Sequence, residues 1–220
     1  MTVRLAVFDC DGTLMDSQAN IVAAMDECFS RNGLERPPPG STRRIVGLSL
    51  PQAMAALVPD ADAAFHDKLA EDYKVCFKAM RSDDRLSHEA LYPGVVDALE
   101  ALEANGWLLA VATGKSDRGL EFSLDYHGIR HRFVSLQTAD RHPSKPHPSM
   151  LEQAMRDAGA LAADTVMIGD TVYDVEMATS AGVHAVGVSW GYHEPEELLA
   201  AGAAHVADDY PALGIYLGAR

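Results

Sequence analysis

The chain has 220 residues, a length that suits one large domain or one and a half. Apolar residues make up 48% and charged residues 23%, an ordinary globular balance that excludes a disordered or low-complexity chain. With 18 basic and 32 acidic residues the net charge is −14, which argues against a nucleic-acid partner or an anionic membrane surface.

The first predicted strand covers residues 3–8, an apolar run that ends at the polar turn Asp9-Cys10-Asp11-Gly12-Thr13. Helical spacing of apolar residues then follows Ser17, recurs near residues 50–58 and extends over 65–80. After Pro93 the pattern changes to alternating helices and strands. The predicted strands are 107–112, 133–136, 165–168, 184–188 and 205–207, and the predicted helices are 95–102, 119–126, 150–158, 172–181 and 195–201.

This alternation predicts an α/β fold, a doubly wound parallel sheet of Rossmann-like type with helices on both faces. One connection is too long for that pattern, because 99 positions separate Phe8 from Trp107 whereas a parallel crossover needs little more than a dozen residues. The intervening stretch contains only helical patterns. We therefore expect residues 1–16 and 92–220 to form the core and residues 17–91 to form an inserted all-helical domain.

Polar residues follow the ends of four predicted strands, which is where parallel sheets bind ligands. They are Asp9 and Asp11 after the first strand, Thr113, Gly114 and Lys115 after the second, Thr138, Asp140 and Lys145 after the third, and Gly169, Asp170, Thr171 and Asp174 after the fourth. Several carboxylates in one cleft repel each other unless a cation joins them. Oxygen ligands of this kind suit Mg²⁺ together with a substrate phosphate.

Aspartate and lysine around one centre favour phosphoryl transfer, in which charge neutralisation and alignment supply most of the catalysis. A carboxylate can also act as the nucleophile and form an aspartyl phosphate. Asp9 and Asp11 lie two residues apart in a loop, so both can face one site. One of them can attack while the other transfers protons.

Four motifs in chain order resemble those of the haloacid dehalogenase superfamily, in its phosphatase branch. They are D-C-D-G-T-L (residues 9–14), A-T-G-K (112–115), K-P-H-P (145–148) and G-D-T-x-x-D (169–174), and together they span nearly the whole chain. Each motif alone is weak, whereas the set at strand ends is specific. The T-G-K step, K-P-H-P and the run Gly187-Val188-Ser189-Trp190-Gly191-Tyr192 resemble phosphoglycolate phosphatases in particular.

The resemblance implies a catalytic role for each matching residue. Asp9 would attack the phosphoryl group, and Asp11 would protonate the leaving oxygen and then activate water. Thr113 and Lys145 would hold the phosphoryl oxygens.

The resemblance also implies a metal site and substrate contacts. Asp170 would ligate Mg²⁺ with Asp9 and the backbone carbonyl of Asp11, and Asp174 would support the metal or orient Lys145. Further substrate-binding positions would be Gly12, Thr13, Gly114 and Lys115, although Lys115 could equally be a solvent-exposed lysine.

The helical insertion resembles the cap domain of this family, which closes over the site and excludes water. A cap loop in related enzymes touches the leaving group of the substrate. Arg43 and Arg44 precede such a segment, and a basic residue there would suit an anionic leaving group. We therefore include Arg44 among the candidate substrate-binding residues.

Four functions are compatible with these motifs to different degrees. The first is a Mg²⁺-dependent phosphatase for a small phosphorylated metabolite resembling phosphoglycolate, and the second is a phosphosugar mutase of the β-phosphoglucomutase type. A 2-haloacid dehalogenase is disfavoured because that branch lacks an acid-base residue at the position of Asp11. A non-catalytic binding protein is disfavoured because the motif set is complete.

Cys10, Cys28 and Cys76 are odd in number and lack metal-site spacing, so we expect neither disulfides nor zinc. No apolar run reaches 18 residues, and the N-terminus does not resemble a signal peptide. These features favour a cytoplasmic enzyme, either monomer or homodimer, without membrane contact.

Overall fold

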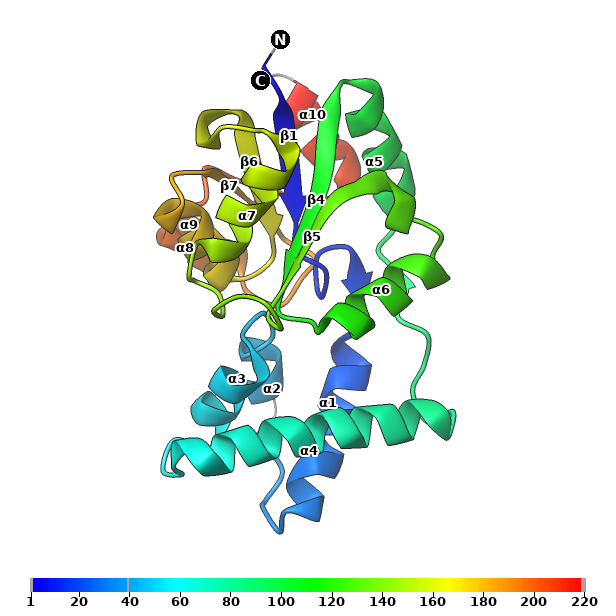
Figure 1. The fold of residues 1–220 in the computed structure, drawn as a ribbon, viewed down its shortest axis with the longest axis vertical. Coiled ribbons are helices and arrows are strands. Elements are labelled where there is room, and N and C mark those ends of the chain that lie inside the picture. Colours follow the sequence, from blue (N-terminus) through cyan, green and yellow to red (C-terminus); the bar gives the residue numbers. More distant parts are fainter. Residues whose placement is uncertain (1, 39, 219–220) are drawn as a thin grey trace.

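A parallel sheet forms the centre of the protein, seen here in a computed structural model that describes residues 2–38 and 40–218 (Figure 1). Six strands pair in the order β5-β4-β1-β6-β7-β8, and every pairing is parallel. The strands are β1 (Arg4–Phe8), β4 (Trp107–Thr113), β5 (Phe133–Thr138), β6 (Thr165–Gly169), β7 (His184–Val188) and β8 (His205–Ala207). The predicted doubly wound α/β core is confirmed.

Helices cover both faces of this sheet because the strand residues alternate in direction. Ala6 and Phe8 of β1 pack into the apolar cluster formed with α5 (Val95–Ala104), α6 (Asp117–Tyr126) and α10 (Tyr210–Gly218). Leu5 and Val7 pack into the opposite cluster with α7 (Ser149–Ala158), α8 (Val172–Ser180) and α9 (Pro195–Ala201). Strand β1 is therefore buried on both faces, as its continuous apolar sequence requires.

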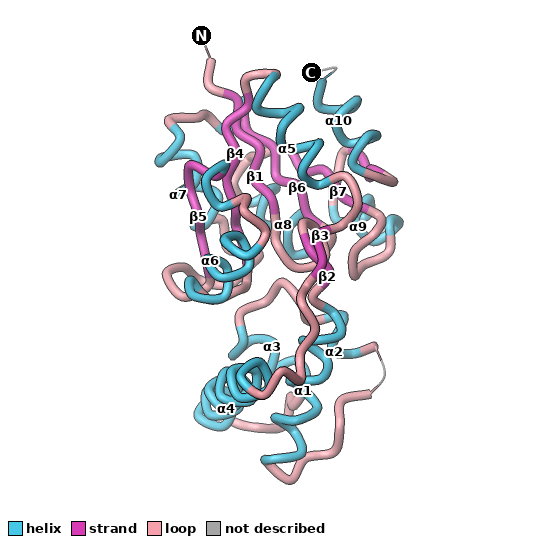
Figure 2. Tube along the Cα trace, turned by 90° about the vertical axis from the view of Figure 1, so that its right-hand side faces the viewer, coloured by secondary structure: helices cyan, strands magenta, loops and turns pink. Residues whose placement is uncertain are grey.

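Residues 17–91, between β1 and α5, form a separate helical layer below the sheet (Figures 1 and 2). It contains α1 (Gln18–Arg31), α2 (Ser41–Arg44), α3 (Leu50–Leu57) and α4 (Ala63–Ser82), which enclose their own apolar cluster. The two segments that connect this layer to the sheet domain pair as a short antiparallel ribbon of β2 (Met15–Asp16) and β3 (Ala90–Leu91). We call this helical layer, residues 17–91, the cap.

Some elements differ from the sequence expectation. The sequence patterns did not predict α2, α10, the β2–β3 ribbon or the two short 3₁₀ turns, η1 (Arg130–Arg132) and η2 (Ala162–Asp164). Ser17 precedes α1 as expected, but its side chain makes no capping hydrogen bond. The three cysteines are free and buried. No described helix is both long and apolar enough to cross a membrane.

Candidate active site

The predicted site residues meet where β1, β4 and β6 end. Strand β1 lies between β4 and β6, so the loop after it receives side chains from both neighbours. Asp9 follows β1, Asp170 follows β6, and Asp174 lies in the first turn of α8. One oxygen from each of these three carboxylates lies within 4.8 Å of the others.

Lys145 is the cation at the centre of this group. Its side chain is fully buried, and its Nζ lies 2.9 Å from Asp9 Oδ1 and 2.6 Å from Asp174 Oδ1. Burial lowers the pKa of Lys145, but Asp174 and Asp9 raise it above the ordinary value. The ammonium therefore stays charged and fixes the positions of both carboxylates.

Asp174 has both oxygens engaged. Oδ1 accepts from Lys145, and Oδ2 accepts from the backbone N–H of Thr171 at 3.1 Å and from its hydroxyl at 2.7 Å. The Thr171 contacts form the capping box that begins α8. Both roles expected for Asp174 fit this geometry, because Oδ1 holds Lys145 and the carboxylate also belongs to the acidic cluster.

Asp9 and Asp170 carry more negative charge than Lys145 balances. Burial, together with Asp174, raises the pKa of Asp9 to about 7 against the lowering effect of Lys145, and Asp9 Oδ2 has no hydrogen-bond partner. Burial, followed by the charges of Asp9 and Asp174, raises the pKa of Asp170 well above its usual range. An oxygen-only, buried and under-neutralised donor set suits a hard divalent cation such as Mg²⁺.

The loop after β1 also contacts the Asp170 carboxylate. Gly12 has φ +86°, and a Cβ there would lie 2.2 Å from Asp170 Oδ2, so only glycine fits. The Thr13 hydroxyl donates to Asp170 Oδ1 at 2.8 Å, and the backbone N–H of Tyr192 donates to Oδ2 at 2.9 Å. The Thr13 carbonyl accepts from the Trp190 indole.

These contacts give the Thr13 side chain a place within the acidic cluster, so only its backbone could meet a substrate. Its side chain is fully buried and its hydroxyl proton is already used by Asp170. The tight turn at Gly12 directs the Thr13 side chain toward the end of β6. There its hydroxyl supports the acidic cluster by donating to Asp170.

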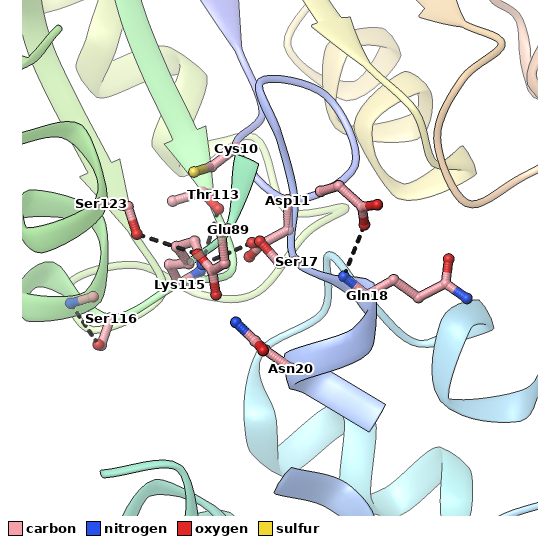
Figure 3. A network of polar contacts seen from close by, with 12 residues as sticks. Cys10, Asp11, Ser17, Gln18, Asn20, Glu89, Thr113, Lys115, Ser116 and Ser123 are labelled. Carbon is pink, nitrogen blue, oxygen red and sulfur yellow. Dashed lines mark hydrogen bonds and ion pairs between the residues drawn. The ribbon is translucent and has the colours of Figure 1, made fainter. Parts of the chain in front are cut away.

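Asp11 faces a different environment from Asp9. Its Oδ1 lies 2.7 Å from Lys115 Nζ, and that ammonium also lies 3.2 Å from Glu89 Oε2, as Figure 3 shows. Burial lowers the pKa of Lys115, but Asp11 and Glu89 raise it above the ordinary value. The backbone N–H of Lys115 donates to the Thr113 hydroxyl at 3.3 Å, which joins the end of β4 to this group.

Lys115 is therefore not the exposed surface lysine that the sequence left as an option, since only 11% of its side chain is exposed. Its partner Glu89 was not among the predicted site residues. Glu89 lies one residue before β3, in the connection that returns from the cap, and it carries no motif. Glu89 comes close to the site because the chain that returns from the cap passes beside α6. There the Ser123 hydroxyl donates to Glu89 Oε2 at 3.3 Å.

The structure corrects the expectation for Arg44 as a substrate-binding residue. Its guanidinium forms two hydrogen bonds with Glu197, at 2.6 and 2.7 Å, on the exposed surface of the core. Arg43 donates to the Gly191 carbonyl at 2.6 Å. Because α2 directs Arg43 onto the loop before α9 and Arg44 onto α9 itself, neither lines the cavity beside Asp11. Both arginines dock the cap on the core.

That cavity, about 420 Å³ in volume, lies between the cap and the core. Asp11, Gly114 and Lys115 line it on the core side. A Cβ on Gly114 would lie 2.8 Å from the Leu48 carbonyl oxygen and 2.9 Å from that of Gly47. This glycine therefore allows the loop of residues 45–49, which we call the cap loop, to approach the end of β4. Asp9, Asp170 and Lys145 lie outside the cavity lining.

Comparison with known proteins agrees with this geometry. The family model described as haloacid dehalogenase-like hydrolase matches residues 6–188. The chain belongs to this family. It is 34% identical to a probable phosphatase, IndB, of Dickeya dadantii, over 94% of this chain and 90% of the relative. It is 35% identical to a phosphoglycolate phosphatase of Pseudomonas putida, over 96% of this chain and 78% of the relative.

The fold is also that of solved structures. A predicted phosphatase from Clostridium acetobutylicum superimposes with a TM-score of 0.89 at 24% identity, with all of both chains covered. The resemblance to the phosphoglycolate phosphatase-like branch, and the expectation of an enzyme, are thereby confirmed.

Replacement of Gly114 by alanine tests whether the cap loop is held against the core at this point. The backbone at Gly114 is outside the left-handed region, so alanine adds only the Cβ, which must displace residues 47–48. We expect faster backbone hydrogen exchange over residues 41–49 in Gly114→Ala. Gly214→Ala is the control, because its Cβ would meet nothing within 4 Å. Equal exchange in both variants would contradict the contact.

Proposed function

We propose that this protein is a Mg²⁺-dependent phosphatase that hydrolyses a small phosphorylated metabolite through an aspartyl phosphate on Asp9. One observation carries the proposal. Two aspartates two residues apart face different surroundings, Asp9 against a buried lysine and an acidic cluster, and Asp11 against a cavity under the cap. This division suits a nucleophile and a separate acid-base group.

Asp9 is suited to attack phosphorus. Lys145 holds its Oδ1 at 2.9 Å, while Oδ2 is left without a partner. A carboxylate with one fixed and one free oxygen is oriented for in-line attack. Lys145 and Thr113 would then bind the phosphoryl oxygens, with the Gly12 and Gly114 backbones close by.

Asp170 and Asp9, with the backbone carbonyl of Asp11, would hold Mg²⁺, while Asp174 keeps Lys145 in place. The bound ion would neutralise charge on the carboxylates and on the phosphoryl group. The under-neutralised charge of Asp9 and Asp170 supports this assignment.

Asp11 would protonate the leaving oxygen and later activate water. Its carboxylate lines the cavity, and Lys115 holds it at 2.7 Å. The proton and the leaving group would therefore be handled on the cap side, away from the metal. The cap would exclude bulk water during this step.

Asp9→Asn tests the covalent role directly. We expect loss of nearly all phosphate release from 4-nitrophenyl phosphate with Mg²⁺, because the amide is a poor nucleophile, while circular dichroism shows an intact fold. Asp140→Asn is the matched control, since Asp140 also follows a strand but is exposed and bonds only the Asp117 backbone. Release of inorganic phosphate, not of a phosphosugar isomer, separates a phosphatase from a mutase. A wild-type rate in Asp9→Asn would exclude the proposal.

Asp11→Asn separates the two acidic roles. General acid-base assistance is worth about 10²–10⁴-fold, so turnover of an alkyl phosphate should fall within this range. The loss should be smaller with 4-nitrophenyl phosphate, whose leaving group needs less protonation, and intact mass spectrometry should then detect phosphorylated enzyme. A decrease below tenfold on the alkyl substrate would count against Asp11 as the acid.

A further inference from the structure

The cavity beside Asp11 is the space that a leaving group must enter. Asp11 lines it, whereas Asp9, Lys145, Asp170 and Asp174 do not. If Asp11 protonates the leaving oxygen, the rest of the leaving group extends from Asp11 into this cavity. The inference therefore rests on the proposed function and narrows its substrate.

The cavity is larger and more apolar than a two-carbon acid requires. Its volume of about 420 Å³ falls in the range of pockets that bind drug-sized ligands, roughly 300–1,000 Å³. The walls include Met25 of α1, Ile45 of the cap loop, Phe77 of α4 and Phe122 of α6. Such walls favour a ring-sized apolar group and disfavour the hydroxyl groups of a sugar, which would lose hydrogen bonds to water.

Cations line the same cavity. Lys74, Lys78 and Arg81 of α4 and Arg118 of α6 contribute to its lining, although the whole chain carries a net charge of −14. Asp11 is the only acidic residue among the described lining residues, and it is paired with Lys115. A run of cations without balancing carboxylates indicates an anionic ligand group.

Two of these cations are available to an anionic ligand. Lys74 is paired with Glu71, whereas Lys78 and Arg118 are exposed and have no carboxylate partner in the described part of the chain. The Arg81 guanidinium lies over the Phe77 ring at 5.0 Å and over the Phe122 ring at 4.4 Å. Arg81 thus places a positive charge beside the apolar walls where cap and core meet.

The cations are also spaced along the cavity. Lys74 and Lys78 are four residues apart and Arg81 follows three later, so successive helical turns of α4 present them on one face. Each turn advances about 5.4 Å along the helix axis. From Lys74 to Arg81 the helix rises roughly 10 Å, so the cations of α4 are spread along the cavity wall.

We propose that the substrate is a phosphomonoester whose leaving group has a ring-sized apolar body and an anionic group at its far end, bound by Lys78 and Arg118. A two-carbon leaving group such as glycolate has no apolar body to contact the walls of this cavity. Arg44, docked against Glu197, has no part in this recognition.

Three alkyl phosphate esters test the proposal with Mg²⁺ present: 4-carboxybenzyl phosphate, its neutral counterpart 4-carbamoylbenzyl phosphate, and 2-phosphoglycolate. Wild-type kcat/KM should be at least about tenfold higher for the carboxybenzyl ester than for phosphoglycolate, the lower end of what filling an apolar pocket contributes. The Lys78→Gln/Arg118→Gln variant should reduce the carboxybenzyl-to-carbamoylbenzyl ratio of kcat/KM by about 5- to 30-fold, a loss limited by solvent exposure.

Lys68→Gln is the matched control, because Lys68 lies on α4 but outside the cavity and is paired with Asp72. It should leave the ratio unchanged. An unchanged ratio in the double variant would overturn the anionic recognition, and higher kcat/KM for phosphoglycolate would overturn the apolar body. In both cases the enzyme remains a phosphatase. Release of phosphate from none of the three esters would instead reject the proposed function, and this inference with it.

Discussion

A single buried ammonium organises the candidate active site. Lys145 lies fully inside the protein, within 3 Å of both Asp9 and Asp174. Burying these charges is costly unless each is paired, so the loops after β1, β5 and β6 must converge on one point. One lysine cannot balance the further charge of Asp170. The excess of negative charge that results suits a divalent cation, which in the proposed mechanism lets the cluster accept a phosphoryl group.

The core and the cap divide the chemistry between them. The core carries the acidic cluster, which in the proposed mechanism contacts only the phosphoryl group that every phosphomonoester shares. The cap closes over Asp11 and adds apolar walls and cations of its own. Arg43, Arg44 and Gly114 act at the junction, the two arginines by docking the cap on the core and the glycine by allowing the cap loop to approach. Discrimination among substrates therefore falls to the cavity between the two layers.

The sequence predicted the core strands and the positions of the acidic cluster because both depend on local pattern. Alternating apolar segments mark a parallel sheet, and its strand ends bring Asp9, Lys145 and Asp170 together. The contacts made by the side chains of Arg44, Thr13 and Glu89 could not be predicted in this way. Each depends on a contact with a residue more than 25 positions away, and nothing in the local pattern encodes that partner.

The β2–β3 ribbon and α10 were missed for a different reason, which lies in their local sequence. The β2–β3 ribbon pairs two residues with two, which is too short for any periodicity. Helix α10 is apolar on all sides, so it lacks the separate apolar and polar faces by which a surface helix is predicted. A local signal was available there, since Asp209 accepts from the Ala212 backbone and Pro211 lies in the first turn.

The response of the protein to Mg²⁺ tests the charge deficit most directly. Thermal unfolding should be followed across a Mg²⁺ titration for wild type, Asp170→Asn and the exposed control Asp208→Asn. We expect Mg²⁺ at about 100 times its dissociation constant to stabilise wild type and Asp208→Asn by roughly 2.7 kcal/mol. Asp170→Asn should lose most of this gain. An equal gain in Asp170→Asn, or none in wild type, would contradict the assignment of the acidic cluster as the metal site.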